Sequence, residues 1–88
     1  MTEPYRIDVT ARAARDLERL PEKIAVACVE FLFGPLADNP QRVGKALRAE
    51  LSGSYSSRRG DYRVIYAIRD DLRVVEIEHI DRRSDIYR

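Results

Sequence analysis

Residues 62–68 of this 88-residue chain alternate between two sets of side chains, as the residues of a β-strand do. One set begins with Tyr62 and Val64, the other begins with Arg63 and Ile65, and aromatic or β-branched residues are frequent in both. Because consecutive strand residues point to opposite faces, Tyr62 and Arg63 lie on different sides of the predicted sheet. If the Tyr62 side packs against helices, Arg63 lies on the open side.

A second predicted strand precedes this one, and Arg59-Gly60-Asp61 joins the two in a turn. The two strands form a hairpin within residues 51–68. Alternation along the first strand separates two groups of side chains, which are Ser54, Ser56 and Arg58 on one side and Tyr55, Ser57 and Arg59 on the other. A cation on such a strand is held in a defined direction.

The N-terminal part of the chain predicts a short strand followed by two helices. Residues 5–9 alternate like a strand, and Thr10 is a typical N-cap for a helix that runs through Leu20. Pro21 suits the first turn of a second helix, because its missing N–H would have no partner there. This second helix is expected to end around Gly34-Pro35 or shortly after.

The first predicted helix is amphipathic. Its apolar positions are Ala13, Ala14, Leu17 and Leu20, whereas the other positions hold Arg12, Arg15, Asp16 and Arg19. The sequence therefore predicts that one face of this helix is buried and that its charged residues are exposed.

Beyond the helices, residues 41–50 have no clear period and are interpreted mostly as a loop. Asp70-Asp71 marks a turn, and Leu72–Ile80 forms a last strand with Val75 and Ile77 facing one way. The order β-α-α-β-β-β predicts one α+β domain over residues 1–88, with an antiparallel sheet packed on one face by a two-helix hairpin. The opposite face is available for function.

Charge is distributed unevenly along the chain. The formal net charge is only +1, with 44% hydrophobic and 35% charged residues, which is typical of a globular domain. Residues 1–40 contain five basic and seven acidic residues, a balance of −2, whereas residues 41–88 contain eleven and eight, a balance of +3. Ten of those eleven cations are Arg, which suits bidentate phosphate contacts. The pattern predicts a local basic patch.

Several functional classes have no support in the sequence. Cys28 is the single cysteine and lies in an apolar helical run, which favours a buried structural thiol. His79 is the single histidine, and a structural or surface role is favoured over a catalytic one. We expect no metal or other cofactor, no membrane association and a cytoplasmic location, because ligand clusters, long apolar runs and a signal peptide are absent from the sequence.

A group of arginines with one tyrosine is the best candidate for chemistry: Arg58, Arg63, Arg82, Arg83 and Tyr87. RNA cleavage by the substrate's own 2′-hydroxyl needs no protein nucleophile, only phosphate stabilisation and two proton transfers. Arginines supply the first requirement. The simpler alternative is a solvated basic rim whose arginines pair with Asp61, Asp81 and Asp85, and charge pattern alone favours it.

Three segments together resemble the RelE/ParE superfamily of toxin–antitoxin toxins, and within it the mycobacterial RelE toxins: ARAARDLERLPEKI, LSGSYSSRRGDYRVIYAI and VVEIEHIDRRSDIYR. The ordered pattern is Leu51-x-Gly53, then Arg58-x-Gly60-x-Tyr62-Arg63-Val64-x-Tyr66, then Arg83-x-x-x-Tyr87. The resemblance implies a microbial-ribonuclease-like domain that enters the ribosomal A site and cuts mRNA there. It also implies a RelB-like antitoxin that wraps the toxin in a hetero-oligomer.

The resemblance assigns site residues position by position. It implies that Arg63 contacts the scissile phosphate and that Arg83 and Tyr87 complete the catalytic set. The residues expected to contact the substrate RNA are Arg58, Arg82, Lys45 and Arg48. Studied RelE enzymes carry lysines where this chain has Ser54 and Ser56, one of them as general base, so the base remains open here, with Tyr87 as the leading candidate.

Two alternative functions remain. A ParE-like toxin would inhibit DNA gyrase on the same fold without cutting RNA, although the retained Arg and Tyr set argues against it. An attenuated toxin would act mainly by binding its antitoxin. Leu17, Leu20 and Phe31 could contribute apolar surface to an antitoxin, but each one is more simply explained as core.

Overall fold

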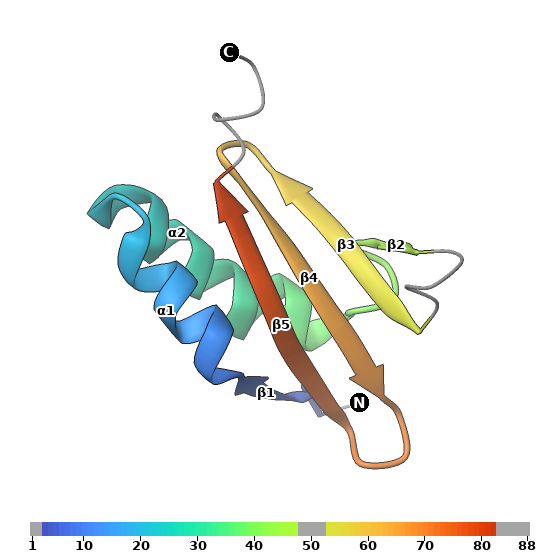
Figure 1. Cartoon of the computed structure of the whole chain (residues 1–88). Coiled ribbons are helices and arrows are strands. Elements are labelled where there is room, and N and C mark those ends of the chain that lie inside the picture. Colours follow the sequence, from blue (N-terminus) through green and yellow to red (C-terminus); the bar gives the residue numbers. More distant parts are fainter. Residues whose placement is uncertain (1–2, 48–52, 83–88) are drawn as a thin grey trace.

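Five strands form one sheet in the order β1-β5-β4-β3-β2, with two helices along one side (Figure 1). The computed structural model describes residues 3–47 and 53–82. Its elements are β1 (Arg6–Val9), α1 (Ala11–Arg19), α2 (Glu22–Phe31), a π-helical turn η1 (Leu32–Leu36), β2 (Lys45–Ala46), β3 (Ser54–Arg59), β4 (Tyr62–Arg69) and β5 (Val74–Arg82). The predicted α+β architecture is confirmed.

The sheet differs from the prediction in two details. β1 runs parallel to β5, with Ile7 opposite Val75, whereas the other neighbouring strands are antiparallel. The segment interpreted as a loop contains β2, whose Lys45 pairs with Ser56. A two-residue strand has no period of its own, so only its pairing with β3 defines it.

The helix boundaries follow from local chemistry. Thr10 is the N-cap of α1, and its hydroxyl oxygen accepts a hydrogen bond from the Ala13 N–H, as predicted. Pro21 stands at the N-cap position of α2, one residue before the first helical turn. The second helix continues through the π-helical turn η1 and past Pro35, which has no N–H to donate.

The core lies between the helices and one face of the sheet. Val64 and Tyr66 of β4 are fully buried, as are Val75 and Ile77 of β5, which confirms the alternation predicted for both strands. Cys28 is also buried, and burial raises the pKa of its thiol to about 11. A thiol in that state is unreactive at neutral pH, in agreement with a structural role.

Exposed apolar side chains lie on α2 and η1 and, with Leu72, in the turn between β4 and β5. Leu20 and Phe31 belong to the core and Leu17 packs against it, so the core interpretation of these residues is confirmed. The exposed large hydrophobic residues of the described chain include Val26, Val29 and Phe33. Among residues 3–47 and 53–82, the helices are too short or too polar to span a bilayer.

A β-bulge in β5 changes which residues face each side of the sheet. Tyr66 pairs with Ile77 but Ile65 pairs with His79, so Glu78 is the extra residue. Ile80 is therefore buried with Ile77, three positions later. The bulge also carries Glu78 towards the open face, where the Ser54 hydroxyl donates to its Oε1 at 3.0 Å.

Candidate functional site

Strand register brings polar side chains together on the open face of the sheet. In one row Arg58 lies opposite Arg63, which lies opposite Asp81. In the next row Ser56 lies between Lys45 and Ile65, and Ile65 lies opposite His79. Partners across neighbouring strands point to the same face. We call these polar residues the open-face cluster: Lys45, Ser56, Arg58, Arg63, His79 and Asp81.

Arg63 and Asp81 form an ion pair inside this cluster. One terminal nitrogen of Arg63 binds Asp81 Oδ2, and the two side chains keep 31% and 27% of their surface exposed. The Nε atom of Arg63 is buried and has no hydrogen-bond partner among the described residues. This ion pair agrees with the alternative interpretation of the arginines as a solvated basic rim, in which Asp81 is one of the expected partners. Arg63 is therefore a partly exposed cation that already has one carboxylate partner.

His79 connects this ion pair to α1. Its Nδ1 lies 2.6 Å from Asp16 Oδ2, and its Nε2 binds Asp81 Oδ1. Asp16 also accepts the Ile80 N–H at 2.9 Å. β1 ends opposite Ile77, so the Asp16 carboxylate satisfies an edge N–H of β5 that no neighbouring strand reaches.

The environment of Asp16 favours its ionised form. Burial alone would raise the pKa of this carboxyl, but the Ile80 N–H, the His79 ring and the Arg12 guanidinium together lower it below its ordinary value of 3.8. The helical pattern predicts an exposed Asp16, and this prediction is wrong, because Asp16 is buried. Asp16 follows the buried Ala13 by three positions, and that spacing was the available sign that it faces the sheet.

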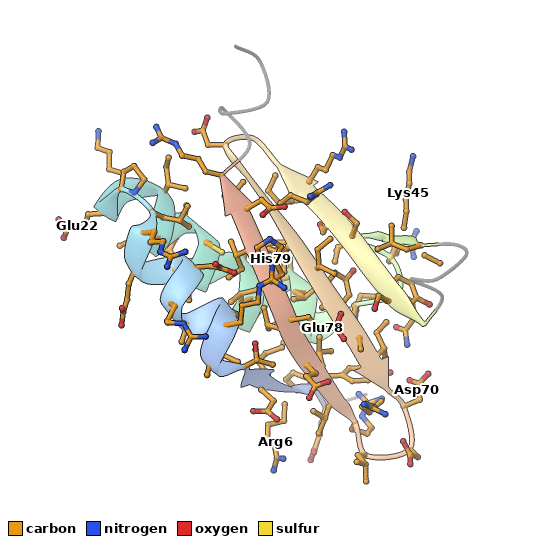
Figure 2. All side chains as sticks on the ribbon, in the orientation of Figure 1. Arg6, Glu22, Lys45, Asp70, Glu78 and His79 are labelled. Carbon is orange, nitrogen blue, oxygen red and sulfur yellow. The ribbon has the colours of Figure 1, made fainter. Side chains whose placement is uncertain are left out.

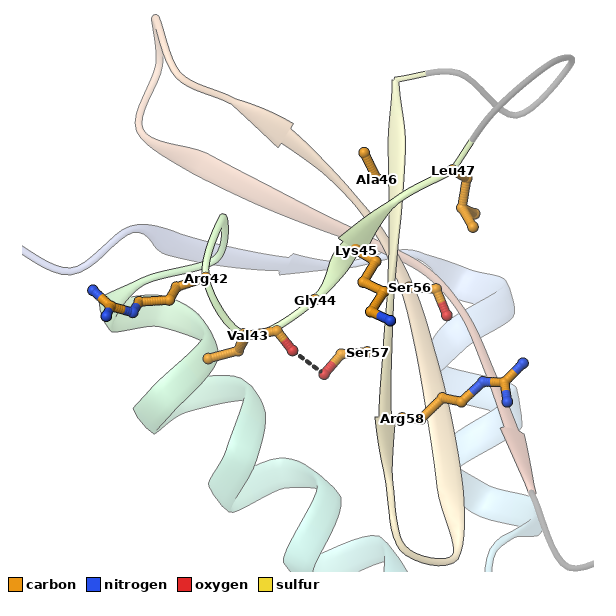
Figure 3. Close-up of a pocket in the computed structure, with 9 residues that line it drawn as sticks. All are labelled: Arg42, Val43, Gly44, Lys45, Ala46, Leu47, Ser56, Ser57 and Arg58. Carbon is orange, nitrogen blue, oxygen red and sulfur yellow. Dashed lines mark hydrogen bonds between the residues drawn. The ribbon is translucent and has the colours of Figure 1, made fainter.

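A groove of about 670 Å³ lies beside the cluster, at the β2 edge of the sheet (Figure 3). Its described lining contains three cations and no carboxylate: Arg42, Lys45 and Arg58. The Ser57 hydroxyl donates a hydrogen bond to the Val43 carbonyl at 2.7 Å, which links the segment just before β2 to β3. Figure 3 shows the Lys45 side chain reaching from β2 over β3. The groove therefore favours an anionic ligand.

Only some of the predicted site residues come together. Arg58, Arg63 and Lys45 belong to the open-face cluster, and Figure 2 shows Lys45 and His79 near opposite edges of the sheet. Arg82 lies opposite the buried Tyr62, which places it on the other side of β5 from Asp81, the register partner of Arg63. Arg48, Arg83 and Tyr87 lie outside the described residues.

The described tyrosines near the cluster are poor candidates for proton transfer. Tyr62 and Tyr66 face the core, and burial raises the pKa of each to about 12. Tyr66 donates its hydroxyl to the Pro40 carbonyl at 2.8 Å. A base must lose its proton near neutral pH, so these two phenols serve packing instead.

Comparisons with known proteins agree with the geometry. Residues 7–87 match the family described as the ParE toxin of type II toxin-antitoxin system, parDE. Toxin RelE of Mycobacterium tuberculosis is 66% identical over 85 residues, which cover 97% of this chain and 88% of that protein. The chain belongs to the RelE/ParE toxin family.

Further members of the RelE/ParE family support this assignment. Toxin RelG of M. tuberculosis is 52% identical, over 97% of this chain and 98% of that protein. The toxin–antitoxin complex RelBE2 of M. tuberculosis gives a TM-score of 0.90 at 49% identity, covering 92% of this chain and 100% of the matched one. The intact RelBE complex of E. coli shares the fold, with a TM-score of 0.75 at 20% identity. The chain is thus a type II toxin similar to mycobacterial RelE.

Proposed function

We propose that this toxin is a ribosome-dependent endoribonuclease that cuts mRNA in the A site. The observation that carries the proposal is the row formed by Arg58 and Arg63, two guanidinium groups on adjacent strands of the face that the helices leave open. Next to this row lies the basic groove that contains Lys45. Together they offer positive charge to a phosphate and to the strand that extends from it.

In this mechanism the RNA supplies its own nucleophile. A base removes the proton of the 2′-hydroxyl, and its oxygen attacks the adjacent phosphorus. An acid protonates the 5′-oxygen of the next nucleotide as it leaves, and a 2′,3′-cyclic phosphate remains. Negative charge grows on the non-bridging oxygens in the transition state, and Arg63 stabilises it by hydrogen bonds from its guanidinium. Family resemblance adds Arg83 as a second phosphate contact and Tyr87 as a proton carrier.

Lys45 supplies a positive charge beside Ser56 on the open face. Family enzymes carry lysines at the positions of Ser54 and Ser56, and here Lys45 is the register partner of Ser56 on the neighbouring strand. Antiparallel partners have Cα atoms about 4.5–5.5 Å apart. The Lys45 ammonium group can therefore reach the surface around Ser56 and provide the positive charge that a serine lacks. We propose that Lys45 binds the RNA backbone there, with Arg58 and Arg48 as further substrate contacts.

The direct test is cleavage of A-site mRNA on purified ribosomes. We expect Arg63→Gln to reduce the cleavage rate at least ~100-fold, in the range found when one preorganised charge donor is removed. Arg69→Gln is the matched control, because Arg69 lies on the same strand and also faces a carboxylate, Glu76, at 3.7 Å. Undiminished cleavage by folded Arg63→Gln would reject the proposal.

Gyrase inhibition is the second candidate, because the matched family is described as a ParE toxin. A supercoiling assay with purified gyrase separates the two functions. We expect no inhibition at toxin concentrations that cut ribosome-bound mRNA completely. Potent inhibition without RNA cleavage would favour the gyrase function, and harmless overexpression without either activity would favour an attenuated toxin.

We further propose that the chain binds a RelB-like antitoxin in a hetero-oligomer. The support is the RelBE2 complex of M. tuberculosis, whose toxin-like chain matches over its whole length at 49% identity. Co-expression of the toxin with the neighbouring reading frame should yield one complex that elutes together. Separate elution of two folded proteins would contradict this. A toxin that acts on ribosomes and is held by an antitoxin is expected in the cytoplasm.

A further inference from the structure

The His79 ring is held between two carboxylates from different parts of the fold. Its Nδ1 lies 2.6 Å from Asp16 on α1, and its Nε2 binds Asp81 on β5. A neutral imidazole carries one N–H, so one of these two contacts would place a ring lone pair against a carboxylate oxygen. An imidazolium donates a hydrogen bond from Nδ1 to Asp16 and forms an ion pair through Nε2 with Asp81. The geometry therefore fits the protonated ring.

Charged groups from three elements surround this ring. α1 contributes Asp16 and also Arg12, whose guanidinium nitrogen lies 3.5 Å from Nε2, farther away than the Asp81 carboxylate. A guanidinium only donates, so this longer contact is not a hydrogen bond when Nε2 is protonated. β5 contributes Asp81 and, one residue before the ring, Glu78, which is bound by Ser54. β4 contributes Arg63 through its bond to Asp81. We call the connected set the His79 network: Arg12, Asp16, Arg63, His79 and Asp81.

One end of the His79 network is fixed. Asp16 is buried, and the backbone N–H of Ile80 binds the same oxygen that His79 contacts. At the other end Asp81 divides its two oxygens, with Oδ1 on His79 and Oδ2 on Arg63. The position of the Arg63 guanidinium is thus connected to α1 through two side chains.

We propose that protonated His79 is a positioning residue that balances the charge of Asp81 and thereby keeps Arg63 available to a phosphate. This inference rests on the proposed function of Arg63. Without the imidazolium, Arg63 and Asp81 form a neutral pair, and an approaching phosphate meets an uncompensated carboxylate beside its intended partner. With the imidazolium, the group formed by Arg63, Asp81 and His79 carries one net positive charge.

The first test is spectroscopic and uses the wild-type chain. His79 is the only histidine, so its ring nitrogens give unambiguous signals in long-range proton–nitrogen NMR spectra. At the pH of the RNA-binding measurement described below, we expect both ring nitrogens to carry protons. A single N–H at this pH would overturn the inference whether or not the protein cuts RNA.

The second test measures binding of a probe that cannot be cleaved, a trinucleotide of RNA with 2′-O-methyl riboses. We expect His79→Gln to weaken its binding about tenfold, because one positive charge near the phosphate is removed. Asp81→Asn in the same chain should restore most of that loss, since it removes the carboxylate that His79 balances. A purely structural role for His79 predicts no rescue, and an unrescued double variant would overturn the proposal.

The two tests separate this inference from the function on which it rests. If wild-type chain fails to cut mRNA on ribosomes but binds the trinucleotide with the expected His79→Gln and Asp81→Asn pattern, the nuclease proposal fails and the positioning role stands. If ribosomal cleavage is normal and trinucleotide binding ignores His79, the positioning role fails alone. In both cases the result for Asp16→Asn should follow that for His79→Gln, because Asp16 orients the ring.

Discussion

The two faces of the sheet are made from alternate residues of the same strands, yet they differ in nearly every physical respect. On the helix-covered face, Val64 and Tyr66 are completely buried and belong to the hydrophobic core. On the open face, Arg63 and His79 remain partly exposed and are linked to carboxylates. Adjacent positions in the sequence can therefore serve stability and function separately, and each face can be altered while the other is kept.

The largest effect should follow from emptying the helix-covered face. Tyr66→Ala removes a fully buried ring and its hydrogen bond to Pro40, and we expect it to lower the free energy of unfolding by about 3–5 kcal/mol. Ile65→Ala, on the open face, should lower it by only about 1 kcal/mol. Urea unfolding measures both. Equal losses from the two substitutions would remove the distinction between the faces.

A smaller loss should follow from crowding the same face at its β2 edge. A Cβ atom on Gly44 would lie 2.2 Å from the Tyr66 hydroxyl and 2.9 Å from the Ser56 carbonyl oxygen. We expect Gly44→Ala to destabilise the fold by about 1–3 kcal/mol, because backbone must move.

Gly34→Ala is the matched control for Gly44→Ala, since nothing lies within 4 Å of a Cβ atom there. Alanine is also the better helix former, so Gly34→Ala should leave stability unchanged or raise it by up to ~1 kcal/mol. A destabilised Gly34→Ala together with a stable Gly44→Ala would show that steric crowding does not determine which residues are tolerated at position 44.

Asp16 joins the two faces, and its contribution should depend on pH. Its pKa is lowered in the folded chain, so its stabilisation is fully present above the ordinary value of 3.8 and is lost as the pH falls through the lower folded value. Asp16→Asn should therefore be less stable than wild type at neutral pH, by about 1–2 kcal/mol. The difference should shrink at strongly acidic pH. A difference that stays constant with pH would contradict the ionised assignment.

The smallest effect is expected at an ion pair outside the cluster. Arg69 and Glu76 are 3.7 Å apart, with 58% and 35% of their side chains exposed. Such pairs contribute roughly 0–1 kcal/mol, so Arg69→Gln should leave both stability and RNA cleavage nearly unchanged. Loss of cleavage in this variant would mean that net charge, rather than the position of Arg63, governs activity.

Much of the helix-covered face could be predicted from sequence, because it depends on local periods. Alternation along residues 62–68 identified the buried side of β4, and Thr10 identified the start of α1. The open-face cluster depends on contacts between distant residues. The bulge at Glu78, the pairing of Lys45 with Ser56 and the contact of Asp16 with His79 each join positions far apart in the chain or interrupt a period. No local pattern encodes them.

The family resemblance predicts the roles of individual residues, but it does not predict the contacts that those residues make with one another. It pointed to Arg63 as a phosphate contact, whereas the partner that shares its charge, Asp81, was expected only as one of several acidic neighbours. The sequence predicts a structural or surface role for His79, whereas its two carboxylate contacts depend on the tertiary arrangement.

The central claim is tested most directly by two neighbouring substitutions on β4, measured for both stability and cleavage of ribosome-bound mRNA. We expect Arg63→Gln to abolish most cleavage while the free energy of unfolding changes by about 1 kcal/mol or less. We expect Val64→Ala to lower that free energy by about 2 kcal/mol while the folded fraction cuts RNA at the normal rate. Cleavage that persists in Arg63→Gln, or that fails in folded Val64→Ala, would contradict the division of labour between the two faces.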